Sequence, residues 1–426
     1  MNCFIPNTSE SPVYHAIDSL PGGMLRMGTT PTIAFLVLAV ASLVAMPHAS
    51  AAVTVRDLGT LPGYTWSEAL GINAAGQIVG TSGDMESQSR PFLWDDGVMT
   101  NLGTLGGTRG TAHDISNTGL IVGESEDATH TMHAFVWESG AMTDLGPGVA
   151  FAVNDAGQAV GCGYPTSPSP PCHAVLWQAG QMTDLGTLVA FAVNDAGQAV
   201  GCGYPTSPSP PCHAVLWQAG QMTDLGTLGG RSGSAYGINS AGQIVGSSLA
   251  PDGFMHAFLW HDGTMTDLGG LPGYQFSVAW DINRAGQVVG SSYGNDGTTH
   301  AVLWANGAVQ DLGNLGGRAA TAFAINDGGQ VVGISFSADG QSRPFLWQDG
   351  VMTVLPTPGD AGGPASDINE ARQVVGGRYL YAPGATAEGP PAGTAFSVAA
   401  IGLGVATFAF YQARRNFRPR KSPNRR

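Results

Sequence analysis

The sequence predicts an all-β fold, a β-propeller built from four-stranded blades, and three observations support this prediction. A motif that reads Ile72–Gly80 in its first copy occurs eight times, at spacings of 38 to 45 residues. A second motif, centred on a tryptophan and ending in Asp-Leu-Gly, occurs seven times between copies of the first. The apolar runs are short, and none has helical spacing over a useful length. Four short strands in each unit of about 40 residues are typical of propeller blades.

Each repeat predicts four strands, which we call A to D in chain order. Strand A ends at an Ile-Asn pair, and the following Asn-x-x-Gly predicts a turn, because Asn bonds its own backbone and Gly accepts a positive φ. Strand B is Gln-Ile-Val-Gly, and a polar loop separates it from strand C, His-Ala-Phe-Leu-Trp. A short link ending in Gly predicts a hairpin to strand D, Met-Thr-Asp-Leu-Gly. Blades that stack face to face explain the nearly continuous apolar strands. Gly and Ala at recurrent strand positions would let adjacent sheets approach closely.

The two ends of the array indicate how the ring closes. Val53–Leu61 reads as a strand D with no strand A, B or C before it, whereas the last repeat lacks strand D. We therefore expect the first strand to complete the last blade and to remove two open sheet edges. This arrangement gives eight blades. Residues 149–188 and 189–228 are identical, so an ancestor with seven blades is plausible, and seven remains the alternative count. A β-solenoid is the alternative architecture.

Residues 1–51 have the features of a signal peptide. Thr32–Met46 is apolar and uncharged, and Ala49-Ser50-Ala51 matches an Ala-x-Ala cleavage site, which predicts a mature chain starting near Ala52. The preceding region is long and contains acids, so the start could be Met1, Met24 or Met27. An uncleaved N-terminal anchor is the alternative.

The C-terminal region predicts a membrane anchor. A Pro/Gly/Ala linker, residues 383–392, leads to an uncharged segment, 393–413, which is long enough to span a bilayer as a helix. Residues 414–426 carry six Arg and one Lys, and a basic flank marks the cytoplasmic side, so the body would face outward. This order resembles a PEP-CTERM sorting tail, but Glu388-Gly389-Pro390-Pro391 stands where Pro-Glu-Pro is expected. That departure puts processing in doubt, and the tail could be cleaved or retained.

The body, residues 52–382, is acidic. It contains nine Arg, no Lys and 28 Asp plus Glu, which argues against a nucleic-acid ligand. Acids gather in the loops between strands B and C. Oxygen-rich loops of this kind can bind Ca²⁺, but no known calcium-loop spacing is present, and a solvated acidic surface is the preferred interpretation.

Five cysteines divide into two groups. Cys3 lies in the leader. The other four flank the B–C loops of the duplicated repeats and predict two local disulfides, Cys162–Cys172 and Cys202–Cys212, in an exported protein. A metal site is the alternative, but two thiols without further convergent ligands do not favour it.

The repeated text resembles the HAF-repeat family of bacterial extracellular proteins. His-Ala-Phe occurs at His133 and His256, and His-Ala-Val occurs at His173, His213 and His300. The resemblance covers nearly all of 53–376 and implies export and a repeat structure. The family has no established catalytic residues, so no site is transferred from it.

Catalytic residues do not stand out from the repeats. The His of strand C, the Asp of strand D and the Trp series recur from blade to blade, and a residue present in every blade more often has a structural role than a catalytic one. His113, Asp114, Trp280, Asp281 and Arg284 are irregular, but they are too few to define a site. We therefore predict no catalytic residue and no cofactor.

The function predicted from the sequence is binding. We expect an exported, surface-anchored, monomeric scaffold or adhesin whose blade loops bind an extracellular glycan, envelope polymer or protein. Loop variation on a fixed ring is what this architecture offers. The alternative is an extracellular polysaccharide hydrolase or lyase that acts from the central channel.

Overall fold

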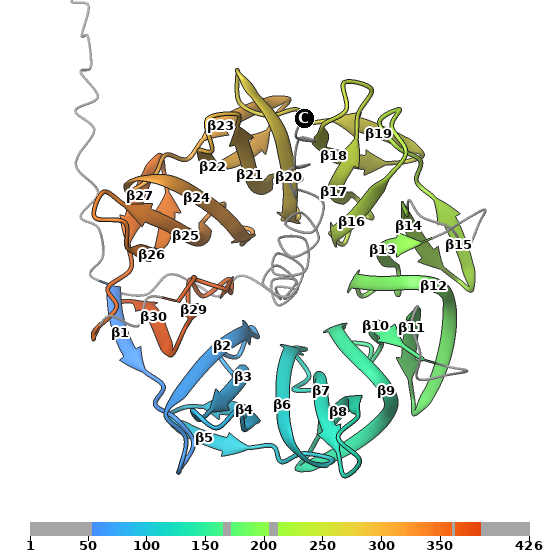
Figure 1. Cartoon of the computed structure of the whole chain (residues 1–426), viewed down its shortest axis with the longest axis vertical. Coiled ribbons are helices and arrows are strands. Elements are labelled where there is room, and N and C mark those ends of the chain that lie inside the picture. The colour runs from blue at the N-terminus through green and yellow to red at the C-terminus, as the bar shows by residue number, and fades with distance from the viewer. Residues whose placement is uncertain (1–52, 165–171, 204–211, 360–362, 385–426) are drawn as a thin grey trace, which may run out of the picture. The chain divides into compact units, whose positions relative to one another are not determined.

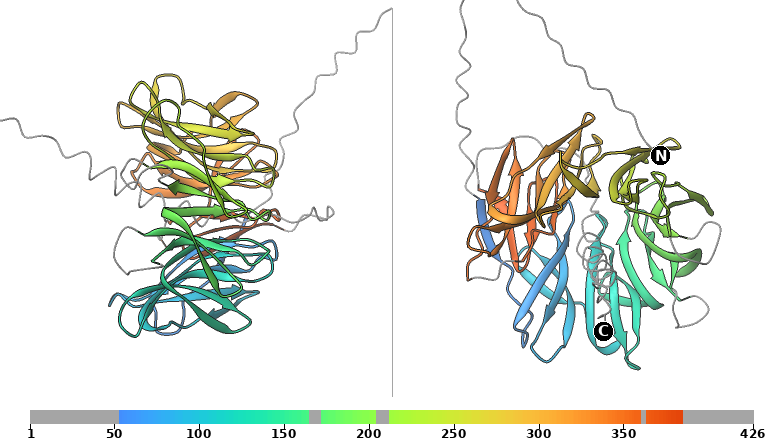
Figure 2. Two further views of the ribbon diagram at one scale, coloured as in Figure 1. Left: turned by 90° about the vertical axis from the view of Figure 1, so that its right-hand side faces the viewer. Right: turned by 45° about the horizontal axis from the view of Figure 1, so that its top comes forward.

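The computed structural model describes residues 53–164, 172–203, 212–359 and 363–384. These residues form β-strands, turns and connections, and among them no helix is long and apolar enough to cross a membrane. The expected signal peptide, the expected membrane helix at 393–413 and the basic tail lie outside the described residues. The strands form eight four-stranded antiparallel sheets arranged around an axis (Figure 1). Two further views show the same arrangement from the side and obliquely (Figure 2).

Each sheet, or blade, follows the order A, B, C, D from the axis outward. Blade 1 contains β2 (Trp66–Ile72), β3 (Ile78–Gly83), β4 (Ser89–Asp95) and β5 (Val98–Asn101). Blade 2 contains β6 (Gly106–Ile115), β7 (Ile121–Asp127), β8 (Met132–Glu138) and the first half of β9 (Ala141–Val153). Blade 3 contains the second half of β9, β10 (Ala159–Gly163), β11 (His173–Gln178) and the first half of β12 (Gln181–Val193).

The next three blades repeat this order with one shared strand at the start. Blade 4 contains the second half of β12, β13 (Ala199–Gly203), β14 (His213–Gln218) and β15 (Gln221–Asp224). Blade 5 contains β16 (Gly233–Ile238), β17 (Ile244–Leu249), β18 (Met255–His261) and β19 (Thr264–Asp267). Blade 6 contains β20 (Tyr274–Ile282), β21 (Val288–Gly294), β22 (Thr299–Ala305) and β23 (Ala308–Asp311).

The last two blades bring the two ends of the array together. Blade 7 contains β24 (Gly316–Ile325), β25 (Val331–Ser337), β26 (Ser342–Gln348) and β27 (Val351–Val354). Blade 8 contains β28 (Asp367–Ile368), β29 (Val374–Gly376), β30 (Tyr379–Pro383) and β1 (Val53–Asp57). β1 pairs antiparallel with β30, from Val53 opposite Pro383 to Asp57 opposite Tyr379. The first strand therefore completes the last blade, as the sequence predicts. The blade count is eight, not seven.

β9 and β12 depart from the predicted pattern of one strand per blade position. Each is a single 13-residue strand that serves as strand D of one blade and strand A of the next. In β9, Ala141–Pro147 pairs with β8 and Gly148–Val153 pairs with β10. The links in these two places are shorter than the usual Leu-Gly-Gly connection, so the chain runs directly from one sheet into the next.

The core lies between adjacent blades. The Phe of strand C is fully buried in four blades, at Phe92, Phe135, Phe258 and Phe345, and the Ile and Val of strand B are buried beside it. The cluster that closes the ring joins Leu58 and Leu61 with Val375 and Leu380. The Trp at the end of strand C packs in these clusters, which confirms that the Trp series belongs to the core between blades.

A belt of asparagine side chains links neighbouring blades. The Asn after strand A donates from Nδ2 to the Gln four residues on and to the main-chain carbonyl of the matching residue in the next blade. For Asn239 these bonds are 2.7 Å to Gln243 Oε1 and 3.0 Å to Asn283 O. The link that closes the ring runs from Asn369 to Asn73 O at 3.0 Å. Ser116 replaces Asn in one blade, and its hydroxyl bonds Thr118 instead.

Two faces of the ring can be distinguished. The face that carries the A–B turns and the C–D hairpins is called the turn face. The face that carries the B–C loops and the D–A connections is called the loop face. Because strand C ends and strand D begins at the turn face, the paired residues Val53 and Pro383 both lie there. The described residues next to both ends of the ring therefore lie at the turn face.

Candidate functional site: the inner wall and the loop face

A β-bulge in strand A gives seven of the eight blades one side chain that does not follow the pleat. In blade 5, Ala235 pairs with Gly246 and Gly237 pairs with Val245, so the register skips Tyr236. The same skip occurs in the first seven blades, and Ser366 has the matching sequence position in the eighth. A bulge redirects a side chain, and strand A is the strand nearest the axis (Figure 1). We call these residues the inner wall: Leu70, His113, Phe151, Phe191, Tyr236, Trp280, Phe323 and Ser366.

The glycine of strand B is required by this bulge. At Gly246, an added Cβ would overlap the carbonyl oxygen of Ser234, which the bulge turns toward strand B. The glycine at the matching position of every other blade would meet the equivalent carbonyl. The Gly of the recurring Ile-Val-Gly sequence therefore faces the carbonyl of the bulge, which explains why Gly is repeated at this position.

Five neighbouring inner-wall rings form a continuous aromatic arc. The ring centroids are separated by 5.9 Å for His113 and Phe151, 6.4 Å for Phe151 and Phe191, 5.7 Å for Phe191 and Tyr236, and 4.9 Å for Tyr236 and Trp280. These spacings are those of favourable tilted aromatic contacts. The side chain therefore varies from blade to blade, while its backbone position stays constant.

Unpaired polar atoms concentrate on the inner wall. Five buried side-chain polar atoms among the described residues have no hydrogen-bond partner, and three of them belong to inner-wall residues: His113 Nε2, Trp280 Nε1 and Ser366 Oγ. Trp280 is 7% exposed and Ser366 is 0% exposed. Buried polar groups are normally paired, so such a concentration calls for an explanation.

Three buried aspartates next to the inner wall have a structural role. Asp114, Asp281 and Asp367 directly follow inner-wall residues, and both carboxylate oxygens of each accept main-chain N–H groups. One of these N–H groups belongs to the same blade and the other to the next. Burial raises the pKa of Asp281 to about 7, although the N–H groups of Ile325 and Ile282 oppose this shift. These carboxylates hold blades together.

A pocket opens on the turn face beside these links. It is lined by residues that include Asn239, Asp281, Asn283, Arg284, Asp327 and Glu370. Arg284 lies 3.3 Å from Asp327, and Glu370 accepts the N–H of Asp327 at 2.8 Å. Burial raises the pKa of Glu370, and the hydrogen bond from the Asp327 N–H opposes this shift. The polar side chains of this pocket are thus engaged in contacts between blades.

The acids of the loop face cap their own loops. Asp127 Oδ1 accepts the N–H groups of Thr129 and Thr131 at 2.8 and 2.9 Å, and Asp296 and Asp339 make similar bonds. Hydrogen bonds, chiefly those from the Ser337 hydroxyl and the Gln341 N–H, lower the pKa of Asp339 to about 2. Within the described parts of the chain, no group of three His, Cys, Asp or Glu residues could hold a metal ion.

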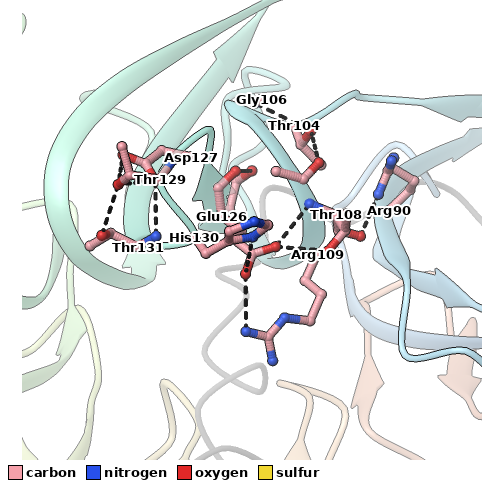
Figure 3. A network of polar contacts seen from close by, with 12 residues as sticks. Arg90, Thr104, Gly106, Thr108, Arg109, Glu126, Asp127, Thr129, His130 and Thr131 are labelled. Atoms are coloured by element: carbon pink, nitrogen blue, oxygen red, sulfur yellow. Dashed lines mark hydrogen bonds and ion pairs between the residues drawn. The ribbon is translucent and has the colours of Figure 1, made fainter.

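One polar network on the loop face centres on Glu126 of the second blade (Figure 3). Glu126, whose side chain is 4% exposed, accepts the N–H and the hydroxyl of Thr108, both at 2.8 Å. Arg109 and His130 reach the other oxygen at 3.2 and 3.3 Å. These bonds, led by those from Thr108, lower the pKa of Glu126 to about 2. Glu126 is a fixed anion that joins the B–C loop to strand A.

The His of strand C pairs with the Asp of strand D. His256 Nδ1 lies 2.8 Å from Asp267 Oδ2, and the pairs at His133, His173, His213 and His300 repeat this contact at 2.7 to 3.0 Å. The same Asp accepts the N–H of the Gly two residues later, for example Gly269 at 2.7 Å. In the closing blade Arg378 takes the place of His and binds Asp57. Each of these contacts joins strand C to strand D of one blade.

Two disulfides close B–C loops. Cys162 pairs with Cys172 and Cys202 with Cys212, with Cα separations of 5.6 and 5.7 Å. The predicted pairing is thus present in the structure. The loop residues between the cysteines lie largely outside the described residues.

Sequence reasoning missed the inner wall. In the sequence His113, Trp280 and Asp281 are irregular, whereas the structure shows that His113 and Trp280 share one position in different blades and that Asp114 and Asp281 share the next. The sequence does contain a signal for the inner-wall position. The position directly after the recurrent Ala of strand A holds six different residue types in the eight repeats, from Leu70 to Ser366.

Comparisons with known proteins bear on the fold alone. No family model and no curated protein matches the chain. Among solved structures, the β-propeller domain of the Trilobed protease from Pyrococcus furiosus is 11% identical, with a TM-score of 0.48 over 70% of this chain and 98% of that chain. A puromycin-hydrolyzing peptidase from Mycobacterium tuberculosis is 13% identical, with a TM-score of 0.46 over 72% of this chain and 56% of that chain. An Aleuria aurantia lectin is 13% identical, with a TM-score of 0.31 over 70% of this chain and 98% of that chain.

Proposed function

We propose that this protein is an exported, surface-anchored binding scaffold of the HAF-repeat type that performs no catalysis. The observation that carries the proposal is the contrast between constant and variable positions in the blades. Links between blades, such as the Asn239 bonds, recur around the ring, whereas the B–C loops and the inner wall change from blade to blade. A constant support that presents variable side chains is suited to recognition.

The position of the chain ends supports an orientation for this scaffold. Val53 and Pro383 pair at the turn face, so the segments that lead to the leader and to the expected anchor both leave there. An anchor at residues 393–413 would hold the turn face toward the membrane. The loop face would then point away from the cell, where an extracellular glycan, envelope polymer or protein can reach the B–C loops.

The environment of the acids supports binding rather than hydrolysis. A glycosidase uses a pair of carboxyl groups that face its substrate. The buried Asp114, Asp281 and Asp367 instead use both oxygens to bind main-chain N–H groups, and Glu126 is held by Thr108, Arg109 and His130. These acids support the ring.

The test is a binding screen with the full chain, extracted in detergent from the cells that express it. Glycan arrays and isolated envelope polymers and proteins serve as ligands, with release of reducing sugar measured in parallel. We expect saturable binding without product. A variant with the blade-6 loop Asn295–Thr298 replaced by serines tests the loop face, and replacement of the exposed hairpin residue Asn306 on the turn face is its control. Time-dependent release of reducing ends, or no saturable ligand at all, would refute the proposal.

A further inference from the structure

The ring of Trp66 lies at the loop face, on the side of blade 1 that faces blade 2. Trp66 pairs with Gly83, and Gly83 pairs with Ser89, so the three residues share one face of the sheet. Ser89 Oγ bonds Gly110 of blade 2, which identifies this face as the one toward blade 2. A Cβ on Gly83 would meet the indole, and the indole N–H donates to Asp84 O at 3.1 Å. The ring is thus held in place, and Trp66 is 39% exposed.

Arg109 lies directly before Gly110, where blade 2 meets blade 1. On its other side, Thr108 O accepts a hydrogen bond from Arg90 of blade 1, so the main chain is held against blade 1 on both sides of Arg109. The Arg109 guanidinium binds Glu126 Oε1 at 3.2 Å, and 53% of the side chain is exposed. A guanidinium carries five N–H groups in a planar fork that fits a carboxylate. Arg109 therefore presents a positioned cation at the loop face.

His130 stands beside Arg109 because both contact the same oxygen atom. His130 Nδ1 lies 3.3 Å from Glu126 Oε1, the atom that Arg109 also binds (Figure 3). The His130 side chain is 71% exposed, whereas that of Glu126 is 4% exposed. Thr108 holds Glu126 in place with its N–H and its hydroxyl. One buried carboxylate thus positions two exposed nitrogen-bearing side chains next to each other.

The carboxylates near this surface differ in how far they oppose an anion. Asp84 and Asp127 each use Oδ1 to accept two main-chain N–H groups of their own loops. Burial raises the pKa of Glu68, which lies on the same face of β2 as Trp66. Glu86 is exposed on the loop that accepts the indole N–H. Its charge opposes an anion, so its removal should strengthen binding.

We propose that the loop face between blades 1 and 2 binds the uronic acid residues of an anionic polysaccharide, with a sugar ring on Trp66 and a carboxylate on Arg109 and His130. A uronic acid carries apolar C–H groups and a carboxylate on one ring, which match an exposed indole face and a nearby guanidinium fork. The acidic body repels a polyanion elsewhere. This inference rests on the proposed binding function and gives it a ligand class and a place.

The experiment measures dissociation constants of the full chain in detergent for three probes. Hexagalacturonate carries both the sugar ring and the charge, its fully methyl-esterified form carries the ring without the charge, and hexaglutamate carries the charge without the ring. We expect hexagalacturonate to bind about tenfold more tightly than either of the others, because each lacks one of the two contacts.

Four variants test the residues. Arg109→Gln should weaken hexagalacturonate about tenfold, through the loss of a charged hydrogen bond. Trp66→Ala should weaken it about fivefold, through the loss of apolar contact. Glu86→Gln should strengthen it about twofold, because an exposed charge is removed. His130 has a positive φ, which asparagine accepts. His130→Asn should weaken binding about threefold, and it keeps the test valid if Arg109→Gln misfolds.

Two control variants make the same changes elsewhere on the loop face. Arg231→Gln removes an exposed guanidinium from the connection before blade 5, and Phe336→Ala removes a ring that is 40% exposed in blade 7. Both should leave the dissociation constant unchanged.

The outcomes separate the site from the binding function. If hexagalacturonate binds but the variants at Arg109, Trp66 and His130 weaken it no more than the controls do, the site is wrong while the binding function stands. If the methyl ester or hexaglutamate binds as tightly as hexagalacturonate, the ligand class is wrong. If hexagalacturonate does not bind but the envelope screen finds another saturable ligand, this inference alone fails. If neither experiment finds a ligand, the proposed function fails with it.

Discussion

Asn239 offers a direct measure of what holds neighbouring blades together. Its side chain is buried and makes four hydrogen bonds. Oδ1 accepts the N–H groups of Ala241 and Gln243, both at 3.0 Å, and Nδ2 donates to Gln243 Oε1 at 2.7 Å and to Asn283 O at 3.0 Å. Three of these bonds shape the A–B turn, and the fourth joins blade 5 to blade 6. The substitutions Asn239→Ala and Asn239→Ser separate the two roles.

The expected effects follow from counting bonds. A typical hydrogen bond contributes about 1 kcal/mol net, and a buried group left unpaired adds to the loss. Asn239→Ala removes all four bonds and should lower the free energy of unfolding by about 3–4 kcal/mol. Serine keeps an acceptor for the turn, as Ser116 Oγ does with the N–H of Leu120 at 3.1 Å. Asn239→Ser loses both bonds donated by Nδ2, one of which is the link between blades, and should cost about 1–2 kcal/mol.

The measurement is equilibrium unfolding in urea, followed by tryptophan fluorescence and far-ultraviolet circular dichroism. Both variants should show a lower midpoint with an unchanged slope, because the surface exposed on unfolding stays the same. Equal losses for Ala and Ser would show that the two bonds accepted by the side-chain oxygen in the turn add nothing to the bonds donated by Nδ2. A loss below about 0.5 kcal/mol for Asn239→Ala would refute the reasoning on the whole belt.

Three further predictions follow from the structure. Gly246→Ala should destabilise the protein by several kcal/mol, because its methyl group would overlap the bulge carbonyl opposite, whereas Gly233→Ala in the same blade should cost much less; melting temperatures compare them. Arg378 lowers the pKa of Asp57, so the stability that this pair adds is present above the unfolded pKa and is lost as the pH falls through the folded one; Asp57→Asn should flatten acid unfolding curves below about pH 4, and an unchanged curve would contradict this. Reduction of Cys202–Cys212 should lower the free energy of unfolding by about 2–3 kcal/mol, and non-reducing peptide mapping should recover that pair; free thiols in the exported chain would argue against it.

The periodicity of the amino-acid sequence is sufficient to predict most of the fold. The Asn-x-x-Gly turn, the four strands and the closing role of β1 all follow from local chemistry that repeats, and the structure contains each of them. The reach of Asn Nδ2 into the next blade could not be predicted in this way, because a turn needs only the Asn oxygen. Links between blades depend on how two sheets stack, which a single repeat does not encode.

The inner wall could not be predicted from the sequence of a single repeat for a related reason. A bulge adds one residue to strand A, and an apolar residue there reads as part of an ordinary buried strand. Phe151 and Phe191 look like core residues in the text, yet the register skips both of them. A comparison of the eight repeats column by column, rather than one by one, would have found the position.

The seam between the duplicated repeats shows how such a ring can grow. Asn154 donates to Asn194 O at 2.8 Å, and Asp155 N–H donates to Asp195 at 3.0 Å. The seam on the far side, from Asn194 to Asn239 O at 3.0 Å, uses the same kind of asparagine bond with a non-identical neighbour. A duplicated repeat can therefore form the same interblade hydrogen bonds on both of its sides. Gene duplication can then add a blade to the ring without requiring a new kind of interface. Selection is then free to act on the one position in the copy that faces the axis.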